Sequence, residues 1–292
     1  MRIREARQSL STAEEHLVQP VRRLRIAPPS PWGDLDLREL WSFRDLLVIL
    51  MMRDVKLRYK QTALGIIWVI LQPLAAALIF AAIFGLFARL PSAGIAYLPF
   101  VFAAMLPWNL FSGALQRAGN SLVLEARLIS KVYFPRAIIP VASCAAVLVD
   151  FAVALIVMVV LLVGYHIPIT FNILALPLLL VITLLLAVGI SLLLSAFNVY
   201  YRDFGYALPF IIQVWMYASP VVYSQQLIPG PLRIIYALNP IVGVIDGFRW
   251  ALLGAGSFPW LSLSISAGMS VLLLVIAGIV FQRVEQYFAD VI

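Results

Sequence analysis

Residues able to carry out chemistry are few in this sequence. It has one cysteine, Cys144, and two histidines, His16 and His166. A structural zinc site takes four closely spaced Cys or His ligands. The three lysines follow Val, Tyr and Ser, whereas a phosphate-binding loop needs Gly before its lysine. We therefore expect no catalytic residue, no metal and no cofactor in this chain.

Asp150 is the only charged residue between Arg136 and Arg202. A charged carboxylate near the middle of a bilayer costs about 2.5–3.5 kcal/mol on insertion scales, so such a residue is a candidate functional group. A proton-coupled carrier would usually show several such acids together with internal repeats, and the two halves of this chain show no self-similarity. We therefore favour an Asp150 that is protonated or hydrogen-bonded and that packs between helices or faces a wet cavity, and we expect Asp150→Asn to keep most of the activity.

Long apolar runs must position these residues, because 63% of the sequence is hydrophobic and 12% is charged, with a mean hydropathy of +0.99. A soluble domain is about half apolar and a quarter charged, and a helix needs about 20 mostly apolar residues to cross the hydrocarbon core. The sequence therefore predicts an all-α integral membrane protein. Six uncharged windows have the required length: 63–88, 97–116, 137–164, 172–197, 204–223 and 261–282.

The positive charges predict the orientation of these spans, because short cytoplasmic loops are enriched in Lys and Arg. With the N-terminus inside, the inner segments carry 18 of these residues and the outer loops carry three. We therefore expect a multi-pass protein of the cytoplasmic membrane with both termini in the cytoplasm. This placement accounts for the net charge of +7. Nucleic-acid binding is a poor interpretation, since the sequence contains no basic, aromatic-interleaved soluble module.

Three segments divide the chain. Residues 1–33 mix charge, Ser and Pro without an apolar core, which predicts a flexible basic cytoplasmic arm. Residues 34–60 predict an amphipathic helix in the membrane interface, followed by a basic juxtamembrane cluster at the depth of anionic headgroups. That cluster either contacts lipid phosphate or only fixes the orientation of the chain. Residues 61–292 are then the six-helix transmembrane domain.

The segment 125–136 is a short amphipathic piece on the predicted cytoplasmic side. Its Leu, Ile and Phe side chains would be exposed to water unless something covers them. Membrane subunits of ABC transporters of the polysaccharide-export (type-2 permease) family have a coupling loop that this segment closely resembles, in the run Leu128-Ile129-Ser130-Lys131-Val132-Tyr133-Phe134-Pro135-Arg136.

Further landmarks resemble the same family in order along the chain. Roughly residues 35–285 are covered by the resemblance, and the arm before Trp32 departs from it. The landmarks are Arg53-Asp54-Val55-Lys56-Leu57-Arg58-Tyr59-Lys60 with Leu64, Gly65, Trp68 and Pro73; Asn198-Val199-Tyr200-Tyr201-Arg202-Asp203; Ser219-Pro220-Val221-Val222-Tyr223; and Asn239-Pro240 with Phe248-Arg249.

The resemblance implies a homodimer paired with two separately encoded ATPase subunits, which bind ATP and Mg, in the inner membrane of a bacterium. It implies that the exported substrate is a lipid-linked polysaccharide such as O antigen, capsule or teichoic acid. It also implies that the interface helix and the coupling loop contact the ATPase. The loop residues expected to do so are Glu125, Leu128, Ile129, Lys131, Phe134 and Arg136.

The basic cluster and several aromatic residues are the expected substrate contacts. The charge of a lipid pyrophosphate cannot cross hydrocarbon unpaired, so we expect it to be met by Arg53, Arg58, Tyr59 and Lys60. Aromatic faces can pack on sugar rings, although such rings more often anchor a protein at the membrane interface. The candidate pore or substrate residues are Trp68, Trp108, Asp150, Tyr201, Trp215 and Tyr217.

The apolar segment 224–259 is too long for a turn. Two short half-helices that return into the outer leaflet would explain it, since unpaired backbone at that depth must be buried in protein or face water. We therefore expect a re-entrant outer hairpin before the last span. Asp246 and Arg249 stand three residues apart, and we expect them to form a structural pair on one helical face.

Two other functions stay open at this point. A permease for a small lipid or drug would share the architecture, and a neighbouring gene cluster for glycan synthesis would separate the two. An integral membrane enzyme that acts on lipid-linked sugars is the alternative from another class. It is the weaker one, because the sequence does not place paired acids at one aqueous mouth, and activity of the purified chain without an ATPase would revive it.

Overall fold

The computed structural model describes residues 37–60, 67–285, 287 and 288, which all lie in the compact unit Leu35–Ile292. The predicted arm, residues 1–33, lies outside the described residues. Within the described ranges the chain is helical and has no strand, in agreement with the predicted fold class. The helices are α2 (Leu37–Ser42), α3 (Arg44–Lys60), α4 (Ile67–Phe80), η1 (Ala81–Phe87), α5 (Tyr97–Leu124), α6 (Ala126–Ile129), α7 (Ile138–Gly164), η2 (Phe171–Ala175), α8 (Leu176–Tyr200), α9 (Asp203–Tyr217), η3 (Gln225–Leu227), α10 (Gly230–Ala237), α11 (Val242–Leu253) and α12 (Trp260–Glu285).

Five helical segments of the described chain are long and apolar enough to cross a membrane. They agree with five of the six windows that the sequence predicts, with boundaries that differ by up to eight residues. The segments are Ile67–Phe87, Tyr97–Leu124, Ile138–Gly164, Phe171–Tyr200 and Trp260–Glu285.

The remaining window, 204–223, forms α9, and the structure does not confirm it as a span. α9 has 15 residues, which corresponds to about 22 Å, whereas the hydrocarbon core is about 30 Å thick. The helix ends because Pro220 disfavours helical geometry at the residue before it. Asn239 also bonds the chain there, since its amide donates to the backbone oxygen of Ala218 and to the hydroxyl of Ser219. The apolar run therefore continues into a turn instead of a longer helix.

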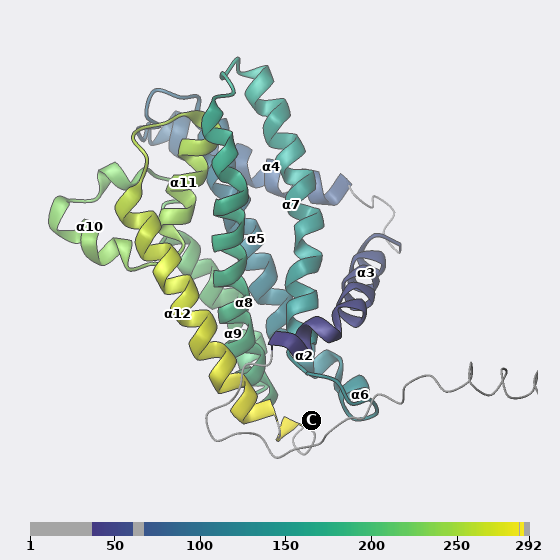
Figure 1. The fold of residues 1–292 in the computed structure, drawn as a ribbon. Helices are drawn as coiled ribbons and strands as arrows, with labels where there is room; N and C mark the ends of the chain where they lie inside the picture. Colours follow the sequence, from purple (N-terminus) through teal and green to yellow (C-terminus); the bar gives the residue numbers. More distant parts are fainter. Residues whose placement is uncertain (1–36, 61–66, 286, 289–292) are drawn as a thin grey trace, which may run out of the picture. The chain divides into compact units, whose positions relative to one another are not determined.

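α5 is the central element of the bundle. It packs against α7 and α8 along most of its length and also against α4 and α11, and Figure 1 shows it between α7 and α8. In an apolar stretch of 18 residues in α5, 83% of the residues are buried. In the corresponding stretches of the other four spans, at most 33% of the residues are buried. Since α5 is enclosed by protein, its polar and charged residues must find partners on the neighbouring helices.

Glycines allow two close approaches in the bundle. A Cβ atom on Gly243 of α11 would lie 2.1 Å from the backbone oxygen of Ser262, in the first turn of α12. A Cβ atom on Gly189 of α8 would lie 2.9 Å from the backbone nitrogen of Leu274 in α12. The missing side chains therefore set how closely α11 and α8 approach α12.

α3 has apolar side chains on two of its sides. One side, which includes Leu46, Leu47 and Leu50, packs into a core cluster, and α3 runs against α7. The other side is exposed and carries Val48 and Ile49, while Met52 and, in α2, Trp41 are exposed as well. The predicted amphipathic helix therefore forms as two helices, but its apolar surface is divided between the protein and the solvent.

The outer segment folds as the two short helices α10 and α11. α11 is mostly buried and packs against α5 and α12, whereas α10 touches α11 and α12 only lightly. Ile241, Val244, Ile245 and Phe248 fill the core from this side. The structure therefore has two short helices where the sequence predicts them.

Candidate functional site

Arg53 joins the middle of α3 to the end of α5. Its Nη2 and Nη1 atoms donate to the two carboxylate oxygens of Glu125 at 2.7 and 3.1 Å. Nη2 also donates to Asp54 Oδ1 at 2.9 Å, and the other oxygen of Asp54 accepts from the Ser143 hydroxyl of α7 at 3.2 Å. Burial lowers the pKa of Arg53, but its hydrogen bonds to Glu125 and Asp54 outweigh this effect and raise the pKa above its ordinary value. This cluster fixes α3 against α5 and α7.

A second cluster surrounds Asp150, on α7. Its Oδ2 atom accepts from Arg117 Nη2 of α5 at 2.9 Å and from Arg58 Nη1 of α3. Its Oδ1 atom accepts from the Tyr59 hydroxyl at 2.5 Å. Burial and, to a smaller extent, the hydrogen bond to Asp150 together raise the pKa of Tyr59 to about 12. Asp150 is therefore hydrogen-bonded between helices, as expected, but with two arginines as partners.

Arg117 is the member of this cluster that the sequence prediction missed. The predicted second span ends at Gln116, which put Arg117 in a loop, whereas α5 continues as a helix to Leu124. Arg117 therefore lies two turns inside the helix and needs an acid within reach. The signal was available in the sequence, since Asp150 was the only acid in the neighbouring predicted span.

The loop after α5 presents a different surface from the one that the sequence suggests. Ile129 and Phe134 are buried in the same core cluster as Phe281 of α12. Arg136 donates from its backbone nitrogen to Glu285 Oε1 at 2.5 Å. These residues anchor the loop on the end of α12. The side chains of the loop that stay exposed are Arg127, Ser130, Lys131, Val132 and Tyr133.

The candidate pore aromatics fall into two groups. Trp108 is buried in α5, and Trp215 is half-buried, with its Nε1 atom donating to Asn239 Oδ1 at 2.9 Å. Their rings flank Phe111, at centroid distances of 5.9 Å for Trp108 and 5.1 Å for Trp215. Both side chains therefore take part in the packing around Phe111. The exposed members of the set are Trp68, Tyr201 and Tyr217.

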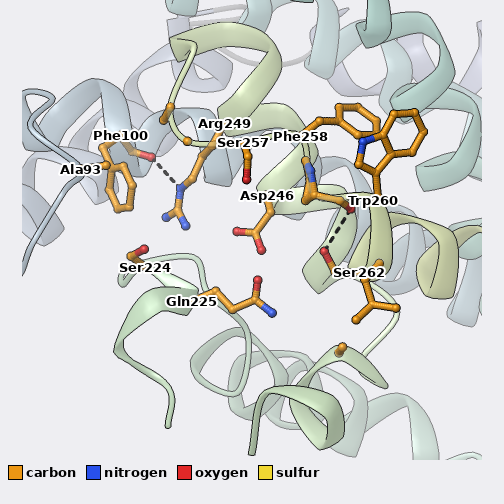
Figure 2. Close-up of a pocket in the computed structure, with 15 residues that line it drawn as sticks. Ala93, Phe100, Ser224, Gln225, Asp246, Arg249, Ser257, Phe258, Trp260 and Ser262 are labelled. Atoms are coloured by element: carbon orange, nitrogen blue, oxygen red, sulfur yellow. Dashed lines mark hydrogen bonds between the residues drawn. The ribbon is translucent and has the colours of Figure 1, made fainter. Parts of the chain in front are cut away.

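Asp246 and Arg249 do not form the expected ion pair among the described residues. The Arg249 guanidinium donates instead to the backbone oxygens of Val221, Phe100 and Tyr223, at 2.8, 3.3 and 3.1 Å. Asp246 lines a cavity of about 480 Å³ beside it, which Figure 2 shows. Asp246 and Arg249 stand three residues apart on α11, as predicted. Arg249, however, donates to backbone oxygens of two distant segments instead of to Asp246.

Comparisons with known proteins cover most of the chain. The profile of the ABC-2 type transporter family matches residues 45–253, which begin inside α3 and end with α11. A protein named O-antigen export system permease protein RfbA from Klebsiella pneumoniae is 27% identical over 85% of this chain and 95% of its own length. Its namesake from Myxococcus xanthus is 28% identical over 87% of this chain and 97% of its own length. The polysialic acid transport protein KpsM of Escherichia coli is 24% identical over 70% of this chain and 80% of its own length.

Proposed function

Since the chain belongs to the ABC-2 type transporter family, we propose that it is the membrane subunit of an ATP-driven exporter that moves a lipid-linked polysaccharide, such as O antigen, across the bacterial cytoplasmic membrane. The likeness to two proteins named as O-antigen export permeases, over at least 95% of their length, is the observation that carries this proposal. A permease for small lipids or drugs finds no comparable support. ATP and Mg are bound by a separate ATPase, and two copies of each subunit form the complex.

The proposed ATPase contact is the exposed part of the loop after α5. Val132 is 54% exposed and Tyr133 is 69% exposed, next to the exposed Lys131. Exposed apolar side chains beside a basic one suit an interface with another protein. Ile129 and Phe134 hold the loop in place from inside, so they act through the loop instead of touching the partner.

We expect the double variant Val132→Glu and Tyr133→Glu to lose the ATPase. Both side chains point to solvent, so the charges leave the core intact and instead place two carboxylates in the proposed contact. Co-purification of the ATPase and export should each fall by about tenfold or more, because buried unpaired charges at an interface cost several kcal/mol. Quantitative pull-down from membranes and a cell-surface glycan assay measure the two effects.

Tyr165→Glu is the matched control for this experiment. Tyr165 is also exposed, but it lies at the opposite end of α7. It follows the last residue of that helix, whereas the loop comes before the first residue. The control should retain the ATPase and export. A loop variant that keeps both would contradict the assignment of the contact.

We propose that six segments cross the membrane and that both termini lie in the cytoplasm. α9 and the turn after it make the sixth crossing, which is short enough to require local thinning of the bilayer. α10 and α11 return into the outer leaflet, and α2 with α3 lies in the inner interface on its exposed apolar side. The distribution of 18 basic residues inside against three outside supports this orientation.

Arg58 and Lys60 are the residues that we expect to attract the lipid phosphate. Arg53 donates to two carboxylates, so its charge is compensated. Around Asp150, two guanidiniums face one carboxylate, and among the described residues this cluster keeps one positive charge in excess. Lys60 is exposed at the end of α3 and adds to this positive potential. An anionic headgroup is therefore attracted to this end of the helix.

Lys60→Gln is expected to lower substrate-stimulated ATP hydrolysis of the reconstituted complex by about fivefold at subsaturating substrate, because a lysine near an anionic headgroup contributes about 1 kcal/mol. Basal hydrolysis should persist. Lys56→Gln, one turn earlier and also exposed, should have a smaller effect. Equal stimulation in the wild type and both variants would leave these lysines as orientation signals only.

A further inference from the structure

A cavity of about 480 Å³ lies between the start of α5, the segment before α10, α11 and the α11–α12 loop. This volume falls within the range of about 300–1,000 Å³ that is typical of small-molecule sites. The cavity lies apart from the Asp150 cluster and from the loop after α5, neither of which lines it. It therefore needs an explanation of its own.

Arg249 forms a fixed part of the wall. Three backbone oxygens accept hydrogen bonds from its guanidinium, which lies 3.8 Å from the centre of the Phe100 ring. An arginine held by this many contacts is rigid. Its charge remains next to the cavity, but its position is set by the protein.

Asp246 points into the cavity from α11. Its Oδ2 atom is buried and has no hydrogen-bond partner among the described residues. Gln225 lies across the cavity from it, and Figure 2 shows the oxygen of its amide, which cannot donate, on the side nearer the carboxylate. A buried carboxylate oxygen without a donor is costly, so a ligand that donates a hydrogen bond to Asp246 would be bound favourably.

Aromatic rings form the side of the cavity nearest α12. Phe258 contacts Trp260 and Trp250, at ring-centroid distances of 4.3 and 4.7 Å. Trp260 is 73% exposed and lies at the rim of the cavity. Rings of this kind offer a large apolar face together with a polar edge, which suits a ligand that has both C–H and hydroxyl groups.

The charge of the lining selects among possible ligands. Within the described lining there is one acid, Asp246, and one base, Arg249, so the cavity carries no net charge. Neither a cation nor an anion therefore meets a net opposite charge in this lining. We propose that this cavity binds a neutral sugar ring, whose hydroxyl groups donate to Asp246 and whose apolar face packs on Trp260. The sugar comes either from the exported polysaccharide, which rests on the proposed function, or from free saccharide.

Binding is tested on the purified full chain with free glucose, mannose, rhamnose and N-acetylglucosamine as probes. Saturation-transfer NMR and the shift in melting temperature report binding, because a ligand of the folded state raises stability. At least one sugar should bind. Asp246→Asn should weaken its affinity by about tenfold or more, since the lost hydrogen bond has a charged acceptor. Ser257→Trp, which fills the cavity from its exposed rim, should abolish binding.

Asp203→Asn is the matched control, because Asp203 is an exposed acid at the start of α9 and its change should leave sugar binding intact. No binding of any sugar, equal binding in Asp246→Asn and Ser257→Trp, or protection by calcium or ethanolamine in place of sugar would overturn the proposal. These assays need neither ATPase nor export, so they stand apart from the proposed function.

An export assay separates the two sources of sugar. If Asp246→Asn loses both sugar binding and export, the site serves the passing polysaccharide. If it loses sugar binding and retains export, the site serves free saccharide. Both results support a sugar site.

Discussion

Replacing Asp150 with Asn is expected to abolish export and to destabilise the chain by about 2–3 kcal/mol. The Asp150 side chain is 17% exposed and accepts from both Arg58 and Arg117. Removal of its charge leaves two guanidiniums facing each other without a counter-ion. Exposed ion pairs contribute less than about 1 kcal/mol, whereas breaking a buried one costs about 3–5 kcal/mol, and this partly buried site lies between the two.

This result differs from the expectation drawn from sequence, in which Asp150→Asn keeps most of the activity. A double variant, Arg117→Gln with Asp150→Asn, separates charge balance from a direct role of the acid. It retains one positive charge, as in the wild-type cluster, and should recover most of the lost stability. Thermal unfolding of the purified protein and the surface glycan assay measure both variants. Wild-type melting and export in Asp150→Asn would refute the account.

Gly243→Ala is expected to destabilise the bundle by about 3 kcal/mol or more. The added Cβ atom would lie 2.1 Å from the oxygen and 2.3 Å from the carbonyl carbon of Ser262. These are backbone atoms, so no side chain can rotate away, and α11 would have to move from α12. Overpacking of this kind costs about 1–3 kcal/mol, and occasionally more. The melting temperature and the yield of inserted protein report the loss.

Gly268→Ala is the control for this change. Gly268 also lies in a helix, α12, and a Cβ atom there would meet nothing within 4 Å. Alanine is favoured over glycine in a helix by about 1 kcal/mol, so this variant should be as stable as the wild type or slightly more stable. Equal melting temperatures for the two alanine variants would show that the approach of α11 to α12 is not tight.

The spans that the sequence predicts well are those bounded by apolar composition alone. The windows 137–164 and 172–197 correspond to Ile138–Gly164 and Phe171–Tyr200. The other boundaries depend on contacts between distant residues. α5 continues as a helix after Arg117, whose side chain is bonded to Asp150. α9 ends where the Asn239 amide donates to the backbone oxygen of Ala218. Neither contact can be read from local hydropathy.

The site shows the same limit. Arg53, Arg58, Glu125 and Asp150 were each selected from the sequence, but as separate groups for lipid, ATPase and pore. The structure pairs them across α3, α5 and α7. Helical spacing suggested that Arg249 bonds to a residue of its own helix, whereas its acceptors come from other segments.

Two ion pairs link α3 to other parts of the bundle. Glu125 stands directly before the loop that carries Tyr133 and is bonded to Arg53 through two hydrogen bonds. Arg58, five residues farther along α3, is bonded to α7 through Asp150. α3 is therefore bonded at two points along its length, once to the residue that precedes the loop and once to α7, and Lys60 lies two residues beyond the second point.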